Sequence, residues 1–356
     1  MHPLAQTRIT RLAVGVTLAL FVSQALGWPA GYLSPVLVSV LLAQPLSAPG
    51  IKVFVGFVLL LTGSLLIGVL IDPLVRTIPL AGSLLMFLLL FLVFRFAVSG
   101  GAPLLATFLS MGIAVVPVMG SSNPKVAMLL LQALGAAAVT AAVFTWLAHR
   151  LIPDPITVSA SPPPATKHDH SSWSATLALR SLFVVAPLML LLMASGNAHS
   201  YAPVLIKSMA LGQQVATDQR RQAAHELVLS TTLGGIGALL IWSVLKIWPS
   251  LLIYTLLVFT FSLVMGRGIF QGEQAHPRAS MWSYALMTCL VVLGPTVSAG
   301  EGGDPALGAM LTRILLMILA SLYAAGTVWL FNRWVLRGRL CETAADHNTA
   351  LTASAR

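Results

Sequence analysis

Charged residues are scarce in this chain. Asp, Glu, Lys and Arg make up 8% of its 356 residues, whereas 57% are hydrophobic. A soluble domain carries roughly 25% charged residues, so the composition excludes an ordinary soluble protein. With two cysteines, the chain cannot hold a disulfide framework. It also has no Walker-type phosphate loop, no metal-ligand cluster and no nucleophile elbow. The sequence therefore predicts a membrane protein that is not an enzyme and uses no cofactor.

Apolar runs fill the chain, and they predict an all-α, polytopic membrane protein with about 12 transmembrane helices. Most runs approach the roughly 20 residues that a helix needs to cross a bilayer. The expected spans are residues 12–27, 30–45, 51–71, 78–98, 102–119, 126–148, 176–195, 198–213, 225–246, 249–266, 279–298 and 307–331.

Lys and Arg gather on one side of these spans. With the N-terminus in the cytoplasm, 15 of the 20 fall on the cytoplasmic side and three on the outer side. Cytoplasmic loops are enriched in Lys and Arg, so both termini are expected in the cytoplasm. This distribution also accounts for the net charge of +10 without a nucleic-acid partner. The expected location is the bacterial inner membrane, with the lipid bilayer around a multi-pass chain.

Polar residues of the first half recur in the same order in the second half. The set that recurs 169 positions later is Arg11, Gly27, Tyr32 and Gln44, as Arg180, Gly196, Tyr201 and Gln213. Matches at slightly different offsets are Gly63–Ile67 with Gly237–Ile241, Arg95 with Arg267, Trp146 with Trp329, and Arg150 with Arg333. Duplicated multi-span units are common in transporters, where the solute is held between the copies.

The duplication predicts four parts of the chain. Residues 1–150 and 175–340 form two tandem six-helix membrane repeats, and six spans per half give both repeats the same orientation. A cytoplasmic linker rich in Pro and Ser joins them at 151–174, and a disordered cytoplasmic tail follows at 341–356. The linker holds two histidines, but two histidines in a flexible stretch make a poor metal site, so none is expected.

The second span of each half carries the candidate substrate-binding residues. Both spans are short and have a proline near their start, which we expect to open the helix and free backbone groups for a solute. A kink that only aids packing is the alternative. The polar residues of these spans are Tyr32, Ser34 and Gln44 in the first half and Tyr201, Lys207, Ser208 and Gln213 in the second.

Lys207 is the most unusual of these residues because it lies near the middle of its span. A cation at the centre of a membrane helix costs on the order of 2.5–3.5 kcal/mol on insertion scales. It should therefore face a cavity, a carboxylate or an anionic solute. The alternative is that its ammonium group extends along the helix to the membrane surface.

Four arginines stand at matched cytoplasmic ends of spans: Arg11 with Arg180, and Arg95 with Arg267. Each alone is best explained as an anchor of a helix end. Together they suggest a ring of guanidinium groups at an inner mouth, which would attract organic anions because Arg holds carboxylates by two parallel hydrogen bonds.

Titratable acids are rare in the spans, and Glu226 beside His225 is the pair best placed to carry a proton. A partly buried carboxylate or imidazole can titrate near neutral pH, which proton coupling requires. The simpler alternative is that Glu226 lies in the first turn of its helix, where the helix dipole favours an acid.

Residues 11–68 and 180–245 resemble the membrane modules of the fusaric acid resistance family, which includes bacterial aromatic acid exporters. The shared features are an arginine before the first span, a second span ending in Gln, and a glycine-rich third span. The resemblance implies an inner-membrane permease that exports small organic, mostly aromatic, acids and is driven by the proton-motive force. It also implies a periplasmic membrane-fusion adaptor as a partner, and Arg11, Arg180, Gln44 and Gln213 as central residues. The chain lacks the large cytoplasmic domain of the bigger exporters, which makes it a compact form.

Two other functions remain open at this point. The chain could be a twelve-span facilitator-type transporter of another solute, although the loop after its second span lacks the basic signature of such proteins. It could also be a membrane enzyme acting on lipid or cell-wall precursors, for which only His225 and Glu226 come close to a catalytic pair. The substrate and the state of homo-oligomerisation are not specified by the sequence.

Overall fold

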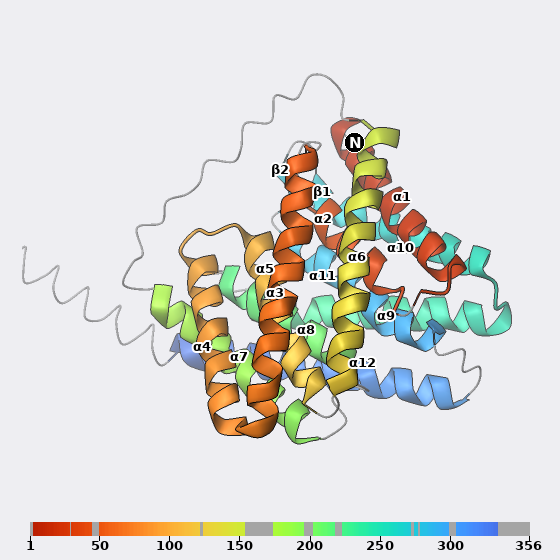
Figure 1. Ribbon diagram of the computed structural model, residues 1–356. Coiled ribbons are helices and arrows are strands. Elements are labelled where there is room, and N and C mark those ends of the chain that lie inside the picture. The colour runs from red at the N-terminus through yellow and green to blue at the C-terminus, as the bar shows by residue number, and fades with distance from the viewer. Residues whose placement is uncertain are drawn as a thin grey trace, which may run out of the picture.

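The computed structural model describes residues 3–28, 30–44, 50–121, 124–153, 174–195, 202–217, 223–271, 274–276, 278–298 and 304–333. The ribbon in Figure 1 is almost wholly helical within these ranges. Its helices are α1 (Pro3–Ala25), α2 (Leu33–Leu42), α3 (Ile51–Thr77), α4 (Pro79–Val98), α5 (Pro103–Gly120), α6 (Pro124–Leu151), α7 (Ser174–Ala194), α8 (Ala202–Thr217), α9 (Ala223–Ile247), α10 (Leu251–Ile269), α11 (Ala279–Ser298) and α12 (Asp304–Phe331).

Each expected span corresponds to one of these helices, so the prediction of an all-α polytopic membrane protein is confirmed. Nine helices in the described ranges are long and apolar enough to cross a membrane. The outer face of the bundle is apolar, as lipid contact requires: Leu70 is 79% exposed and Leu80 is 77% exposed. The short α2 and α8, and the apolar part of α5, fall below the length of a full span, so a count of twelve spans stays a prediction.

A small antiparallel hairpin between β1 (Phe270–Gln271) and β2 (Gln274–Ala275) follows α10 and was not predicted. The expected linker and tail lie almost wholly outside the described residues, so their predicted disorder is not tested.

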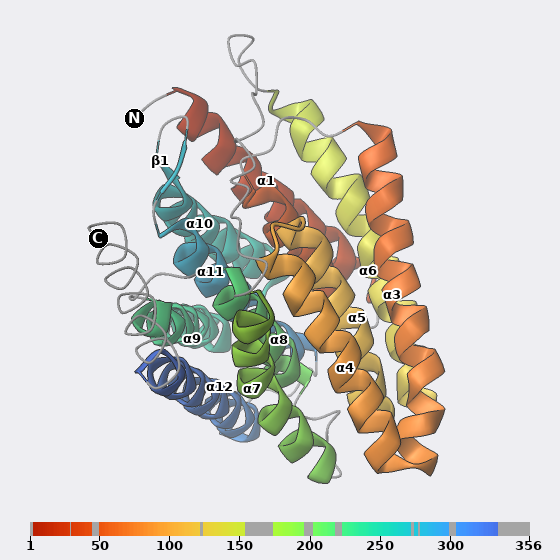
Figure 2. The ribbon, with the colours of Figure 1, turned by 90° about the vertical axis from the view of Figure 1, so that its left-hand side faces the viewer.

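The first six and the last six helices make matching contacts. Within the first six, α3 packs on α5 and α6; within the last six, α9 packs on α11 and α12. Between the two sets, α1 packs on α10 and α4 packs on α7, as Figure 2 shows. Likewise α2 contacts α11, and α8 contacts α5. Each of these contacts is reproduced when every helix is exchanged for the one six places along.

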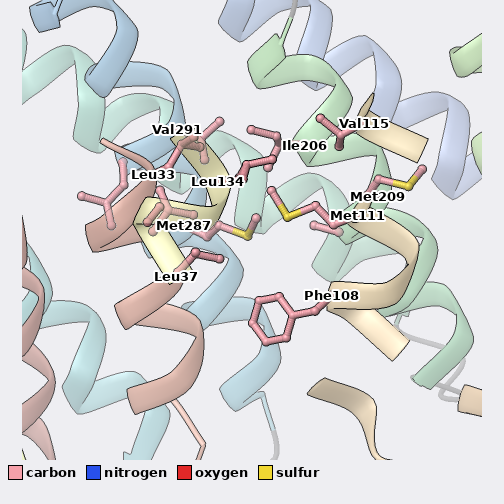
Figure 3. Packing of buried hydrophobic residues seen from close by; sticks show 14 of the residues in the cluster. Leu33, Leu37, Phe108, Met111, Val115, Leu134, Ile206, Met209, Met287 and Val291 are labelled. Carbon is pink, nitrogen blue, oxygen red and sulfur yellow. The ribbon is translucent and has the colours of Figure 1, made fainter. Parts of the chain in front are cut away.

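The centre of the molecule is an apolar interface between the two sets of helices. Figure 3 shows side chains from α2, α5, α8 and α11 pointing toward one another. Three of them are methionines, Met111, Met209 and Met287, and all are buried. Methionine is unbranched and flexible, so it fills an irregular space between helices without demanding one fixed geometry.

The prolines of α2 and α8 do not break these helices, contrary to expectation. Pro35 is the third residue of α2, and Pro203 is the second residue of α8. The N–H groups of a first turn have no partner within the helix, so proline costs nothing there and favours a helix start. Prolines inside a helix occur elsewhere, for example Pro117 in α5 and Pro295 in α11.

Glycine lets α3 and α5 approach closely. A Cβ atom on Gly112 would lie 2.6 Å from the Cβ of Ser64, closer than real atoms allow. At the same place the Ser64 hydroxyl donates a hydrogen bond to the carbonyl oxygen of Phe108 at 3.1 Å. The matching pair α9 and α11 meets in the same way, since a Cβ on Gly234 would lie 2.6 Å from that of Thr288. Small residues at such crossings are typical of membrane helices.

We expect Gly112→Ala to lower the stability of the protein by about 1–3 kcal/mol, because the added methyl group overpacks the α3–α5 contact. The matched control is Gly135→Ala on α6, where a Cβ meets nothing within 4 Å. Thermal unfolding of the purified protein in detergent measures both. Equal unfolding temperatures for the two variants would contradict the close packing of α3 on α5.

Candidate functional site

A cavity of about 360 Å³ lies among α1, α2, α3, α5 and α6. This volume is within the range of about 300–1,000 Å³ that is usual for small-molecule sites. Its polar lining residues are Arg11, Gln44, Thr145 and His149. Its aromatic lining residues are Phe54, Phe57 and Phe108. Val53, which is 58% exposed, also lines the cavity, so it reaches the surface of the bundle.

Arg11 supplies the positive charge of this cavity. Its side chain is only 3% exposed, although it stands near the start of the first helix. A guanidinium group keeps its charge even when buried, because its pKa is far above neutral. Gln44, just after the end of α2, lines the same cavity, so the structure brings together two of the predicted binding residues.

Aromatic rings form the apolar wall of the cavity. The rings of Phe57 and Phe108 meet edge to face, with centroids 4.9 Å apart and an interplanar angle of 73°. This arrangement presents ring faces and edges to a neighbouring aromatic group, which is the geometry that aromatic pairs prefer. These phenylalanines were not predicted from the sequence, because phenylalanine in a membrane span carries no signal that separates a site from lipid contact.

Two polar residues of α6 complete the cavity and were also missed. Thr145 is 2% exposed, and its Oγ1 atom has no hydrogen-bond partner in the described part of the chain. The Nδ1 atom of His149 lies 2.9 Å from the carbonyl oxygen of Thr145. A buried hydroxyl without a partner costs free energy unless a water or a ligand satisfies it.

Arg180, the counterpart of Arg11, is held by protein groups. It is 2% exposed and donates hydrogen bonds to the carbonyl oxygen of Val215 at 2.8 Å and to Oδ1 of Asn332 at 3.0 Å. Arg95 and Arg267 are both exposed, at the ends of α4 and α10. Of the four arginines expected to form a ring, only Arg11 lines the cavity.

Lys207 is buried in the interior of the bundle, which excludes the alternative that it extends to the membrane surface. Its side chain is 2% exposed, and its Nζ atom donates a hydrogen bond to Oγ1 of Thr288 at 2.9 Å. The Nζ atom also lies 5.9 Å from the centre of the Tyr284 ring. Both partners belong to α11 and are neutral, and no carboxylate within 4 Å of Lys207 is found in the described ranges.

The remaining predicted residues of α8 serve contacts within the protein. The Ser208 hydroxyl donates to the carbonyl oxygen of Val204, one turn earlier. The Gln213 side chain donates to α5, to the carbonyl oxygen of Ala106 and to the hydroxyl of Ser110, both at 3.0 Å. Gln213 therefore ties the two sets of helices together. Tyr201 lies outside the described residues.

The start of α2 borders a second, smaller cavity. The Ser34 hydroxyl is buried and accepts a hydrogen bond from Thr140 of α6 at 2.9 Å. Ser34 also lines a cavity of about 250 Å³ together with Trp28 and Gln132. Tyr32 is half-buried, and its side chain packs against Gly294 of α11. The two cavities thus lie at opposite ends of the short helix α2.

The two residues expected to couple proton transfer differ in their exposure. Glu226 is buried in the first turn of α9 and lies 3.6 Å from Nε of Arg278, measured from its Oε1 atom. His225 beside it is exposed. Glu226 therefore has the first-turn position that the simpler alternative predicted, where the helix dipole favours an acid. It also forms an ion pair with Arg278.

No cluster of three or more potential metal ligands occurs among the residues that the structure describes. The two linker histidines, His168 and His170, lie outside those residues.

Comparison with known proteins gives one match. The family described as "Protein of unknown function (DUF2955)" matches residues 8–148, which run from α1 into α6. No curated protein and no solved structure matches the chain. The matched residues include Arg11 and the whole lining of the larger cavity up to Thr145. The resemblance to the fusaric acid resistance family stays a prediction.

We expect Lys207→Met to leave the unfolding temperature unchanged or to raise it. Methionine has a side chain of similar length, and the substitution removes a buried cation whose described hydrogen bond is the one to Thr288. Thr288→Val should instead destabilise the protein by about 1–3 kcal/mol, since it leaves the Lys207 ammonium without an acceptor. The double variant should recover most of that loss. Thermal unfolding checks all three, and additive effects of the two substitutions would contradict the coupling.

Proposed function

We propose that this protein is an inner-membrane permease that exports small organic acids, mainly aromatic ones, at the expense of the proton-motive force. The observation that carries the proposal is the cavity that combines the buried Arg11 with the rings of Phe57 and Phe108. A guanidinium group suits a carboxylate, and aromatic walls suit an aromatic ring. A volume of about 360 Å³ is ample for a ligand with a single ring.

Burial strengthens the attraction between Arg11 and an anion. In a surrounding of low polarity, Coulomb attraction is several times stronger than in water. The Thr145 hydroxyl and the Gln44 amide lie at the same cavity and offer hydrogen bonds to a carboxylate or to a ring hydroxyl. An amphipathic anion would satisfy the charged and the apolar parts of the lining together, whereas a neutral sugar or a cation would leave Arg11 without a counter-charge from the ligand.

The matching helix contacts support two repeats of one module. The family match ends in α6 and so spans the first module alone. In this proposal both modules have the same orientation, both termini are cytoplasmic, and Arg11 and His149 lie toward the cytoplasm. The smaller cavity at the start of α2 would then lie toward the periplasm, with the Ser34–Thr140 hydrogen bond between the two.

Lys207 is the residue of the second module that we assign to transport. It is buried and joins α8 to α11 through its hydrogen bond to Thr288. A buried ammonium whose described partners are neutral favours an anion beside it. Glu226 and His225 remain candidates for proton coupling, and a periplasmic adaptor and a homo-oligomer remain candidate partners.

The export proposal is tested by accumulation of labelled 4-hydroxybenzoate in cells that express the protein. Wild type should lower accumulation and raise tolerance to the acid, and an uncoupler that collapses the proton gradient should abolish both effects. Arg11→Gln should reduce efflux by about tenfold or more, because it removes the charge that binds the carboxylate. Lys246→Gln is the matched control, since it removes an exposed charge at the end of α9.

Equal accumulation with and without the protein, across a panel of hydroxybenzoates and fusaric acid, would contradict the export of aromatic acids. Full efflux by Arg11→Gln at normal protein levels would be compatible with export, but it would contradict the binding of the substrate in the cavity at Arg11. Efflux that continues in the presence of the uncoupler would contradict the proton-motive force as the energy source.

A further inference from the structure

Arg313 is a cation on the side of α12 that packs inside the bundle. Met310 lies three residues before it and Met317 four residues after it, and both methionines are fully buried. Residues at these spacings share one face of an α-helix. Arg313 itself is half-buried. Its side chain therefore belongs to the face that meets other helices, and part of it stays accessible.

The contacts of the Arg313 guanidinium group within the described residues are with neutral groups. Its Nη1 atom donates a long hydrogen bond, 3.4 Å, to Oγ1 of Thr296 on α11. It also interacts electrostatically with the hydroxyl group of Tyr32, just before α2. No carboxylate within 4 Å of Arg313 is found in the ranges that the structure describes. A guanidinium group has five N–H donors, so one long hydrogen bond leaves donors for a ligand.

Arg313 lies where the two halves meet. Tyr32 belongs to the first half, and its side chain packs against Gly294 of α11. Close to this contact, the Gln24 side chain near the end of α1 donates a hydrogen bond to the hydroxyl of Ser298 at 3.5 Å. In the orientation that we propose, α1 and α11 end on the periplasmic side, and α2 and α12 begin there. The junction at Arg313 therefore lies toward the periplasm.

The helix α11 connects this junction to Lys207. Thr296, the acceptor of Arg313, lies eight residues after Thr288, the acceptor of Lys207. Eight residues span about 12 Å along an α-helix. Both threonines are buried, and each hydroxyl donates to a carbonyl oxygen one turn earlier, so it meets its cation as an acceptor. Two cations, one from α8 and one from α12, are thus placed along one helix.

The architecture of the bundle does not require a cation at this place. The helices α6 and α12 correspond at an offset of 183, as Trp146 with Trp329 shows. At this offset Arg313 corresponds to Leu130, which is half-buried in α6. The same position thus accepts an apolar residue in the first half. An ionisable residue inside a membrane span is costly, so one that packing does not need points to function.

We infer that Arg313 and Tyr32 form an outer binding site for the carboxylate of the exported acid, separate from the cavity at Arg11. This inference rests on the proposed function for the ligand class and for the direction of transport. Arg313 pairs with the carboxylate, and the Tyr32 hydroxyl donates a hydrogen bond to it. The acid reaches this site after Lys207 and leaves it for the periplasm.

The test measures exchange of labelled 4-hydroxybenzoate in right-side-out and inside-out membrane vesicles that contain the full chain, without a proton gradient. Varying the acid on one face gives the half-saturating concentration for that face. Arg313→Gln should raise the periplasmic value by about tenfold or more and keep the cytoplasmic value within about twofold of wild type. Arg11→Gln should show the opposite pattern.

Three further variants separate binding from structure. Arg313→Leu introduces the residue that α6 has at the corresponding position, so it should fold and should lose periplasmic affinity as Arg313→Gln does. Tyr32→Phe should raise the periplasmic value by about two- to fivefold, because it removes one hydrogen bond. Lys246→Gln is the matched control, since it removes an exposed charge on the same side and should change neither value.

An unchanged periplasmic value in Arg313→Gln and Arg313→Leu, or equal losses on both faces, would overturn the outer site while export stands. Unchanged exchange together with loss of bound anionic phospholipid from the purified variants would also overturn it, because Arg313 would then bind a lipid headgroup. No exchange by wild type in either kind of vesicle would contradict the proposed function as well.

Discussion

Three cations, Arg11, Arg180 and Lys207, lie in the interior of a bundle whose outer face is apolar. Hydrocarbon offers a cation no hydrogen-bond acceptor, so each charge must be accommodated by protein or by something the protein binds. Arg180 is accommodated by a carbonyl oxygen and an amide, and Lys207 by a hydroxyl and an aromatic ring. Arg11 lines a cavity together with aromatic rings, and this combination is the basis of the function that we propose.

The close packing around these cations depends on small residues at two matching helix crossings. Gly112 lets α5 approach Ser64 of α3, and Gly234 lets α9 approach Thr288 of α11. Thr288 is also the hydrogen-bond acceptor of Lys207, so packing and polar contact are joined at one residue. The corresponding crossing in the first half stands beside Phe108, which lines the cavity. The same kind of helix crossing thus stands beside an apolar cavity wall in the first half and beside a buried amine in the second half.

A duplicated module allows such divergence. In the duplication that we propose, the two copies can place different side chains at corresponding positions while they keep the same helix contacts. The substitutions that separate the halves, from Phe57 to Thr231 and from Thr145 to Val328, are of this kind. The first half has an aromatic ring and a hydroxyl group at these positions, where the second half has a hydroxyl group and an apolar side chain.

The sequence by itself determined the class of protein and the approximate place of each helix, although α1 begins at Pro3 and not at the expected residue 12. It also predicted the matching of Arg11 with Arg180. It could do so because hydrophobic length and the order of polar residues are local properties that a single chain displays directly. Only the tertiary structure decided that Lys207 is buried against Thr288, that Pro35 starts α2 without breaking it, and which arginine lines a cavity. These depend on residues far apart in the chain, and an apolar span gives no sign of which of its faces meets lipid and which meets another helix.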